Sequence, residues 1–443
     1  MASTYLTRTP ASAGNQKTYT FSCWVKRSAI STGVINGLFV GQNTSATEIT
    51  GFRFSTSDAI EFGTFSGGWD WQLVTNRVFR DTSAWYHIVF AVDTTQATSS
   101  DRAKLYINGV QETSFSTETY PSLNFDTDVN TTNLHVVGAA IFNSVIEHLD
   151  GSMAHVHFID GTAYDASAFG ETDATTGIWK PKTAPSVTYG TNGFFLKFEN
   201  SGAFGTDSSG NANTFTVNGT MTQTIDTPSN VFATLNPLKL PSGFSLSNGN
   251  TKFSTASASD RGNVNSTLLV NKGKYYAECK IVGGNEKEGI GAIGEDELPA
   301  NDFLTGTQNI LFNTDVPAVF INGSQTNVTG VTPVNNDIIG MALDLDNGRA
   351  YFHVNGTYIN SGNPDTETGY YSFTVGSTYW GIGSADGSTL TGSAIMNYGN
   401  GYFGTTAVSS AQNPDDGIGI FEYSVPTGYK SLCTKSINSQ EYD

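Results

Sequence analysis

Hydrophobic and polar residues alternate along most of the chain, in short runs separated by clusters of Gly, Asn, Asp and Ser. Successive side chains of a β-strand point to opposite faces, so this pattern predicts strands that bury one face. Helical periodicity is almost absent, and the clearest helical candidate is one short turn near 165–169, which Asp165 could cap. The chain is therefore predicted to be all-β, built from antiparallel β-sandwiches. The clearest strands are 19–25 (YTFSCWV), 85–92 (WYHIVFAV), 104–107 (KLYI), 194–198 (FFLKF), 275–281 (YYAECKI) and 338–343 (IIGMAL).

Two hairpins in different halves of the chain look alike. Residues 90–93 (FAVD) and 103–109 (AKLYING) flank one polar turn, and residues 341–344 (MALD) and 350–356 (AYFHVNG) flank another. Each second strand ends in Asn-Gly, the pair that supplies the positive φ of a tight reversal. The likeness indicates two related sandwiches in tandem.

Prolines mark the boundary between these two halves. Pro228, Pro237 and Pro241 would interrupt any ladder of strands. The sequence therefore predicts a first domain over 1–225, a linker over 226–241 and a second domain over 242–443.

The composition is polar but weakly charged. The 443 residues include 22 Lys and Arg against 40 Asp and Glu, a net charge of -18, while charged residues make up only 14%. A nucleic-acid partner is excluded because phosphate binding needs a basic face, and the acidity disfavours an anionic membrane surface. No apolar run approaches the length of a membrane span, so no membrane insertion is expected. The uncharged polar surface favours hydrogen-bonded contacts with neighbouring proteins or polysaccharide.

The two halves resemble two families of β-sandwich. The first resembles the laminin-G/concanavalin A-like lectins through 19–27 (YTFSCWVKR), 84–89 (AWYHIV), 105–111 (LYINGVQ) and 150–160 (DGSMAHVHFID). The second resembles SPRY-type domains through 273–278 (GKYYAE), 337–348 (DIIGMALDLDNG) and 425–429 (VPTGY). This tandem, over nearly the whole chain, is similar to virion proteins of tailed bacteriophages.

The resemblance implies a structural component of a phage particle, tail- or fibre-associated or head-decorating, that displays lectin-like domains for adhesion to host-surface glycans. Its expected partners are other virion proteins and host-surface polysaccharide, and particle symmetry favours a homo-oligomer. Residues 1–17 lack the apolar core of a secretory signal. We therefore expect assembly in the host cytoplasm and localisation on the virion. The alternative is a purely architectural decoration or adaptor protein with no ligand.

Catalysis is not supported by the sequence. Glycoside hydrolysis needs two carboxylates facing a sugar at a fixed separation, and the resemblance to concanavalin-like glucanases would place them on a Glu-x-Asp-x-x-Glu strand that this chain lacks. Asp344 and Asp346 alternate, but they lie at a hairpin turn, where Asp caps backbone N–H groups. We expect no enzyme and no cofactor, with a polysaccharide-degrading glycoside hydrolase as the alternative.

Two groups of residues could bind a metal, but for neither is metal binding favoured over a structural interpretation of the same residues. His155 and His157 alternate and could bind a metal if His148 or Asp150 came close, although half-buried polar aromatics explain them more simply. Asp207, with Asn211, could hold Ca²⁺ in its Gly/Ser loop, although an Asx-turn explains the spacing equally well. No metal ligand is assigned.

Residues 67–71 (GGWDW) form the most distinctive short segment. Trp69 and Trp71 alternate and are predicted to face one side of a strand, with Asp70 on the other. Parallel indoles suit stacking on the apolar C–H faces of sugar rings, because an aromatic side chain contributes a large contact area at low entropic cost. Trp69, Asp70 and Trp71 are therefore the candidate carbohydrate-binding residues. The competing interpretation places both tryptophans in the core.

In the second half of the chain, residues 365–371 and 399–403 are predicted to form exposed loop tips.

Overall fold

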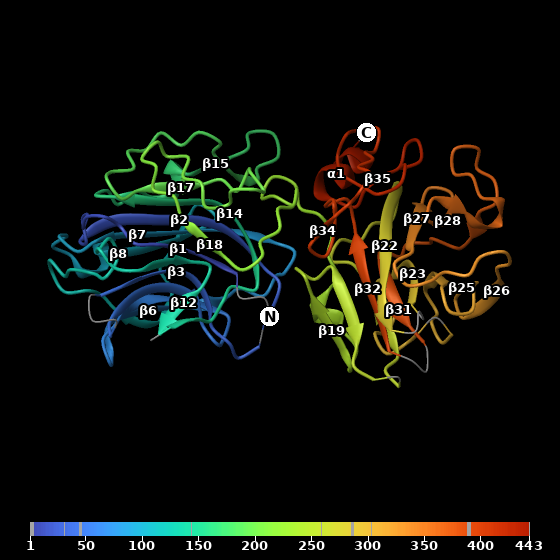
Figure 1. Ribbon diagram of the computed structural model, residues 1–443, viewed down its shortest axis with the longest axis horizontal. Coiled ribbons are helices and arrows are strands. Elements are labelled where there is room, and N and C mark those ends of the chain that lie inside the picture. The colour runs from blue at the N-terminus through green and yellow to red at the C-terminus, as the bar shows by residue number, and fades with distance from the viewer. Residues whose placement is uncertain are drawn as a thin grey trace. The chain divides into compact units, whose positions relative to one another are not determined.

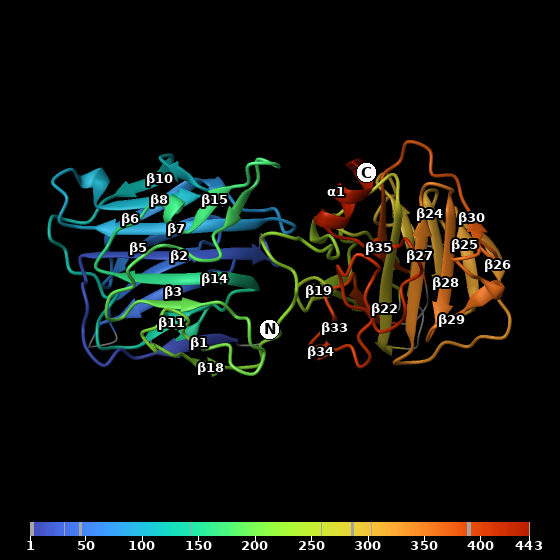
Figure 2. The ribbon, with the colours of Figure 1, turned by 90° about the horizontal axis from the view of Figure 1, so that it is seen from above.

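The structure is a computed structural model that describes residues 4–30, 32–43, 47–142, 144–257, 259–284, 288–302, 304–387 and 391–442. The chain divides into two compact units, Met1–Gln223 and Thr224–Asp443. The first is coloured blue to green in Figures 1 and 2, and the second yellow-green to red. Each unit contains two large antiparallel sheets, so the prediction of an all-β chain with antiparallel sandwiches is confirmed. Among the residues that the structure describes, no helix has the length and apolar character of a membrane-spanning segment.

The first unit is a sandwich of an eight-stranded and a six-stranded sheet. The eight-stranded sheet has the order β10 (Phe115–Thr119), β6 (Trp69–Val78), β5 (Ala59–Phe65), β4 (Ile49–Phe54), β3 (Asn36–Gln42), β11 (His135–Val137), β1 (Tyr5–Arg8) and β18 (Thr216–Asn218). The six-stranded sheet has the order β17 (Phe194–Leu196), β14 (Gly151–Asp160), β2 (Thr18–Arg27), β7 (Trp85–Asp93), β8 (Ala103–Ile107) and β9 (Val110–Glu112). Shorter elements are the ribbons β12 (Ala140–Phe142) with β13 (Ser144–Ile146) and β15 (Gly170–Thr172) with β16 (Trp179–Pro181), and the 3₁₀ turns η1 (Ser99–Asp101) and η2 (Ala166–Ala168).

Buried aromatic rings fill the space between these two sheets. Phe21 of β2 stacks on Phe39 of β3 with ring centroids 4.7 Å apart, and Phe52 of β4 lies 4.4 Å from Phe90 of β7. Fully burying a Phe side chain contributes about 1.5–3 kcal/mol, so this cluster is a large share of the driving force. The predicted turn near 165–169 is also confirmed, because the Asp165 carboxylate caps η2 by accepting the Ser167 N–H.

The second unit is built from a nine-stranded and a six-stranded sheet. The nine-stranded sheet has the order β19 (Phe244–Ser247), β20 (Lys252–Thr255), β32 (Gly392–Asn397), β22 (Lys274–Gly284), β27 (Ile338–Asp344), β28 (Arg349–Val354) and β29 (Thr357–Tyr358), with β30 (Tyr371–Ser372) beside β28 and β35 (Lys430–Ser431) parallel to β22. The six-stranded sheet has the order β21 (Gly262–Val264), β31 (Trp380–Asp386), β23 (Glu288–Gly294), β24 (Asn309–Asn313), β25 (Ala318–Ile321) and β26 (Ser324–Asn327). Shorter elements are the ribbon β33 (Tyr402–Phe403) with β34 (Thr406–Ala407), the 3₁₀ turns η3 (Pro237–Lys239) and η4 (Ile359–Ser361), and the helix α1 (Thr434–Tyr442).

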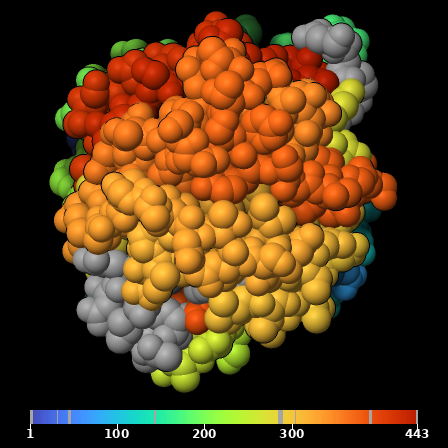
Figure 3. All heavy atoms as spheres, turned by 90° about the vertical axis from the view of Figure 1, so that its right-hand side faces the viewer, coloured from blue at the N-terminus to red at the C-terminus, as the bar shows by residue number. Residues whose placement is uncertain are grey.

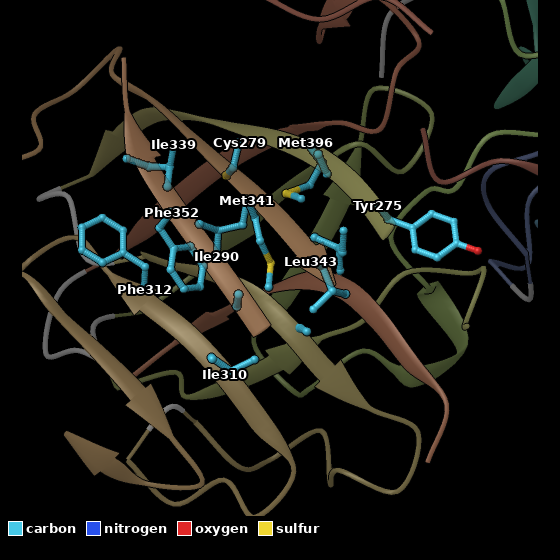
Figure 4. Packing of buried hydrophobic residues seen from close by; sticks show 14 of the residues in the cluster. Tyr275, Cys279, Ile290, Ile310, Phe312, Ile339, Met341, Leu343, Phe352 and Met396 are labelled. Atoms are coloured by element: carbon cyan, nitrogen blue, oxygen red, sulfur yellow. The ribbon is translucent and has the colours of Figure 1, made fainter. Parts of the chain in front are cut away.

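The core of the second unit lies between its two sheets. Figure 4 shows Met341 and Leu343 of β27 facing Ile290 and Ile310 of the other sheet, with Phe352 beside them, and all five side chains are buried. Figure 3 shows the outer surface of the second unit on the side of β25, β26 and β28. Much of this surface is made by segments coloured yellow to orange.

Two segments of the second unit were predicted as exposed tips, and they differ. Residues 365–371 are mostly exposed, as expected, but Tyr371 at their end is buried. Residues 399–403 are mostly buried, with Phe403 only 5% exposed, so that prediction was wrong. The C-terminal segment covers one end, since a Cβ on Gly399 would lie 2.5 Å from the Ser431 hydroxyl, and Phe403 packs against Ile338 and Ile395. Within 226–241, the expected linker, Phe232 and Leu235 are buried in the second unit.

Candidate functional site

A β-bulge separates the three candidate carbohydrate-binding residues at the start of β6. Phe65 of β5 is opposite Trp69, and the next residue along β5, Thr64, is opposite Trp71. Asp70 is therefore an extra residue without a partner position in this ladder, and such an insertion re-aims the neighbouring side chains. As a result, Trp69 and Trp71 lie on opposite faces of the eight-stranded sheet. The prediction that the two indoles share one face was wrong.

Trp71 is a core residue. It is 0% exposed, and its indole N–H donates to the Thr64 hydroxyl at 2.8 Å. Its ring meets Phe62 edge-on with centroids 5.8 Å apart, inside the space between the two sheets. For Trp71 the competing interpretation, a tryptophan of the core, is the correct one, and this side chain is not available to a ligand.

Trp69 is partly exposed on the outer face of the same sheet. Its ring packs edge-on against Phe65 with centroids 5.5 Å apart, and the Arg53 guanidinium carbon lies 5.3 Å from the indole centroid. A guanidinium over an indole is attracted by the negative face of the ring. Contacts on two sides therefore hold Trp69 in one position while part of its surface stays open.

A small recess adjoins Trp69 on this outer face. Gly51 of β4 and Gly63 of β5 are cross-strand partners at its floor, and Ala140, the first residue of β12, forms a side together with Ala139 before it. The recess has room for about one water molecule, ~10 Å³. The site is thus an open aromatic platform with a small recess, and it has no deep pocket.

Charged groups beside the platform are paired with one another. Arg53 Nη2 lies 3.1 Å from Glu61 Oε1, and Arg53 Nη1 lies 3.9 Å from Glu147 Oε2. The Gln72 amide also donates to Glu61 Oε1 at 2.8 Å. Burial raises the pKa of the Glu147 carboxyl, and the Arg53 charge opposes that shift. Asp70 is exposed and accepts the Ser66 hydroxyl at 2.7 Å, so it remains open to further donors.

The two alternating histidines lie beside the same aromatic ring, because His155 also stacks on Phe195, with centroids 6.0 Å apart. The β14 register shifts between Ala154 and His157, and His155 has a φ of 46°. His157 is buried, stacks on Phe195 with centroids 3.9 Å apart, and has its Nδ1 atom 3.0 Å from the Tyr189 hydroxyl. Burial, with His155 and His87 nearby, lowers the pKa of His157 well below its usual value. Within the described ranges, no group of three His, Cys, Asp or Glu side chains is arranged to hold a metal ion.

The Asp207 loop is an Asx-type turn. Asp207 accepts the backbone N–H groups of Phe195, Ser209 and Asn213 and the Ser209 hydroxyl, at distances between 2.8 and 2.9 Å. Four donors occupy both carboxylate oxygens, so a Ca²⁺ ion would have to displace them. This geometry favours the structural interpretation of the loop.

Comparison with known proteins places the platform inside a recognisable domain. Residues 2–168 match the family model of the concanavalin A-like lectin/glucanases superfamily. This part of the chain is similar to a concanavalin A-like domain. The match contains every residue of the platform, from Gly51 and Arg53 to Trp69 and Glu147. Carbohydrate binding is compatible with such a domain, whose superfamily includes both lectins and glucanases.

Solved structures similar to the chain include two SPRY domains and a toxin. The SPRY domain of human HERC1 shares 16% identity over 37% of this chain and 96% of its own, with a TM-score of 0.31. Stonustoxin shares 16% over 37% of this chain and 27% of its own, with a TM-score of 0.30. The PSpry domain of TRIM65 shares 17% over 37% of this chain and 91% of its own, with a TM-score of 0.28. Scores this low carry no argument about function. A comparison with curated protein sequences finds no match to this chain.

Proposed function

We propose that the chain is a non-enzymatic structural component of a tailed-phage particle and that its first unit binds host-surface polysaccharide. The observation that carries the binding proposal is Trp69, a partly exposed indole held on the outer face of the eight-stranded sheet by Arg53 and Phe65. The match to the concanavalin A-like superfamily over 2–168 supports it. The place on a particle rests on the resemblance of the tandem sandwiches, and other copies of the chain and other virion proteins are the proposed partners.

Trp69 suits a sugar because both partners are amphipathic. The C–H face of a pyranose ring is apolar and can stack on the indole, while its hydroxyls need donors and acceptors at the edge. The exposed Asp70, which follows Trp69 in the chain, can supply such an acceptor. Because Trp69 is already fixed by its neighbours, little conformational entropy is lost when a ligand stacks on it.

The proposal assigns no catalysis to this face. A glycosidase needs one carboxyl group as acid and another as nucleophile or base, both directed at the glycosidic bond. Of the carboxylates near Trp69, Glu61 and Glu147 are both engaged by the same guanidinium, which leaves only Asp70 without a cationic partner among these three. A recess with room for about one water molecule does not enclose a sugar ring.

The test compares binding and hydrolysis by the full chain. Wild type should bind glycans on an array and host cells in suspension, and Trp69→Ala should lose both at least tenfold. Tyr379→Ala is the matched control, because Tyr379 is 44% exposed in the second unit and should leave binding unchanged. Release of reducing ends from host polysaccharide would establish the hydrolase alternative. Absence of binding by wild type would favour the architectural alternative.

The particle assignment has its own test. Mass spectrometry of purified particles should find the chain at a fixed copy number, together with the virion proteins that it contacts. If the chain is found only in infected-cell lysate and never on particles, this part of the proposal is wrong, whatever the outcome for glycans.

A further inference from the structure

We propose that the Trp69 platform selects uncharged sugar units and rejects anionic ones, such as uronates and sulfated or phosphorylated sugars. This inference rests on the proposed glycan binding and names its ligand class. It is drawn from the charges around the indole and from how completely the one guanidinium beside it is paired.

Arg53 is the residue that an anionic sugar would be expected to use, since its planar guanidinium matches a carboxylate or sulfate. Here that group already faces Glu61 at 3.1 Å and Glu147 at 3.9 Å, and its remaining face covers Trp69. The Arg53 side chain is 19% exposed and the Glu61 side chain 10%. An incoming anion would have to displace two protein carboxylates that share this partly desolvated environment.

One further carboxylate lies next to Trp69 in the chain. Asp70 follows Trp69 directly and is exposed. Its negative charge adds to those of Glu61 and Glu147, and all three repel an anion that approaches the platform.

Apart from the paired Arg53, the residues that line the recess carry no positive charge. Gly51 and Gly63 bring no side chain to it, and Val40, Ala139 and Ala140 are apolar. With one guanidinium facing Glu61 and Glu147, and with Asp70 next to Trp69 in the chain, the local balance of charge is negative.

A matched pair of ligands tests the inference. One ligand is a neutral glucan that the wild type binds, and the other is the same glucan after its C6 hydroxymethyl groups have been oxidised to carboxylates. We expect at least tenfold weaker binding of the oxidised form at low salt. The variant Glu61→Gln/Glu147→Gln frees Arg53 and should reduce that preference to threefold or less, with unchanged circular dichroism showing that it folds.

The outcomes separate this inference from the proposed function. If wild type binds the oxidised glucan as well as the neutral one, the charge selection is wrong and glycan binding stands. If the double variant keeps the full preference, Glu61 and Glu147 are not its cause and the inference fails. If wild type binds none of a panel of neutral glucans, mannans and galactans or their oxidised forms, the proposed function fails and the inference falls with it.

Discussion

The guanidinium carbon of Arg53 lies 5.3 Å from the ring centroid of Trp69, on the solvent side of a sheet whose other side is packed with phenylalanines. A contact of this kind is worth about 0.5–1 kcal/mol at an exposed site. It holds the indole over a floor made by two paired glycines, Gly51 and Gly63. The platform is therefore ordered before any ligand arrives.

The two floor glycines should respond differently to substitution. The atom nearest to a Cβ on Gly51 would be Val40 Cγ2, at an ordinary contact distance of 3.7 Å, whereas a Cβ on Gly63 would lie 2.2 Å from the Trp71 carbonyl oxygen. Gly51→Leu should therefore fold normally, occupy the recess and lower glycan affinity at least tenfold. Gly63→Ala should destabilise the first unit, because the backbone must move. Melting temperature and glycan titration of both variants check this, and a large loss of stability in Gly51→Leu would contradict it.

Substitution of the two tryptophans of the bulge should affect different properties, stability for Trp71 and glycan binding for Trp69. Trp71→Ala removes a fully buried ring and its hydrogen bond to Thr64, and such truncations typically cost about 3–5 kcal/mol. Trp69→Ala removes a partly exposed ring and should cost about 1 kcal/mol or less, while it lowers glycan affinity at least tenfold. Urea unfolding of the full chain separates the two. Equal losses of stability would mean that Trp69 is also a core residue.

Features of the first unit that depend on the local pattern of residues could be predicted from the sequence, and features that depend on pairing between strands could not. The alternating burial of β8, which was predicted over 104–107, follows from the sequence, because a strand that buries one face must alternate. The placement of Trp69 and Trp71 on opposite faces was not predictable, because it arises where Asp70 is left out of the pairing with β5. Gly67 and Gly68 before the strand are the only local hint of an irregular start. Arg53 was missed for the same reason: cross-strand neighbours depend on register, which one sequence does not specify.

A buried ion pair in the first unit should be costly to break. Arg27 and Asp58 are 3.0 Å apart, with side chains 1% and 3% exposed. Asp58→Asn leaves the Arg27 charge unpaired in the interior, which typically costs about 3–5 kcal/mol. Lys104 and Asp101 form an exposed control pair at 2.9 Å, and Asp101→Asn should cost about 1 kcal/mol or less. Denaturant unfolding compares them, and a small effect of Asp58→Asn would show that Arg27 can reach solvent.

A buried carboxyl group should make the second unit less stable as pH rises. Glu278 accepts the Glu422 and Tyr423 backbone N–H groups and the Tyr276 hydroxyl, yet burial raises its pKa from 4.5 to about 7. Because the folded state holds this proton more tightly, the contribution of Glu278 to the free energy of unfolding is complete below pH 4.5 and is lost as pH rises through 7. The largest value that this contribution can reach is about 3 kcal/mol, since each unit of pKa corresponds to about 1.36 kcal/mol.

The Glu278 prediction is measured as a difference between two chains. The stability of wild type minus that of Glu278→Gln should fall between pH 4.5 and 8, in urea unfolding of the full chain with hydrogen exchange of β22 as the local probe. The subtraction is needed because burial lowers the pKa of His353 to about 3, so that its contribution is lost as pH falls below 6.5. A difference that rises with pH would mean that the hydrogen bonds to Glu278 outweigh its burial.

The most direct test of the central claim is calorimetric titration of the full chain with a neutral host polysaccharide, using wild type, Trp69→Ala, Trp69→Phe and the control Tyr379→Ala. The account predicts binding by wild type and by Tyr379→Ala with equal affinity, a loss of at least tenfold in Trp69→Ala, and partial recovery in Trp69→Phe, which keeps an aromatic face. Binding by Trp69→Ala at the wild-type affinity would contradict it.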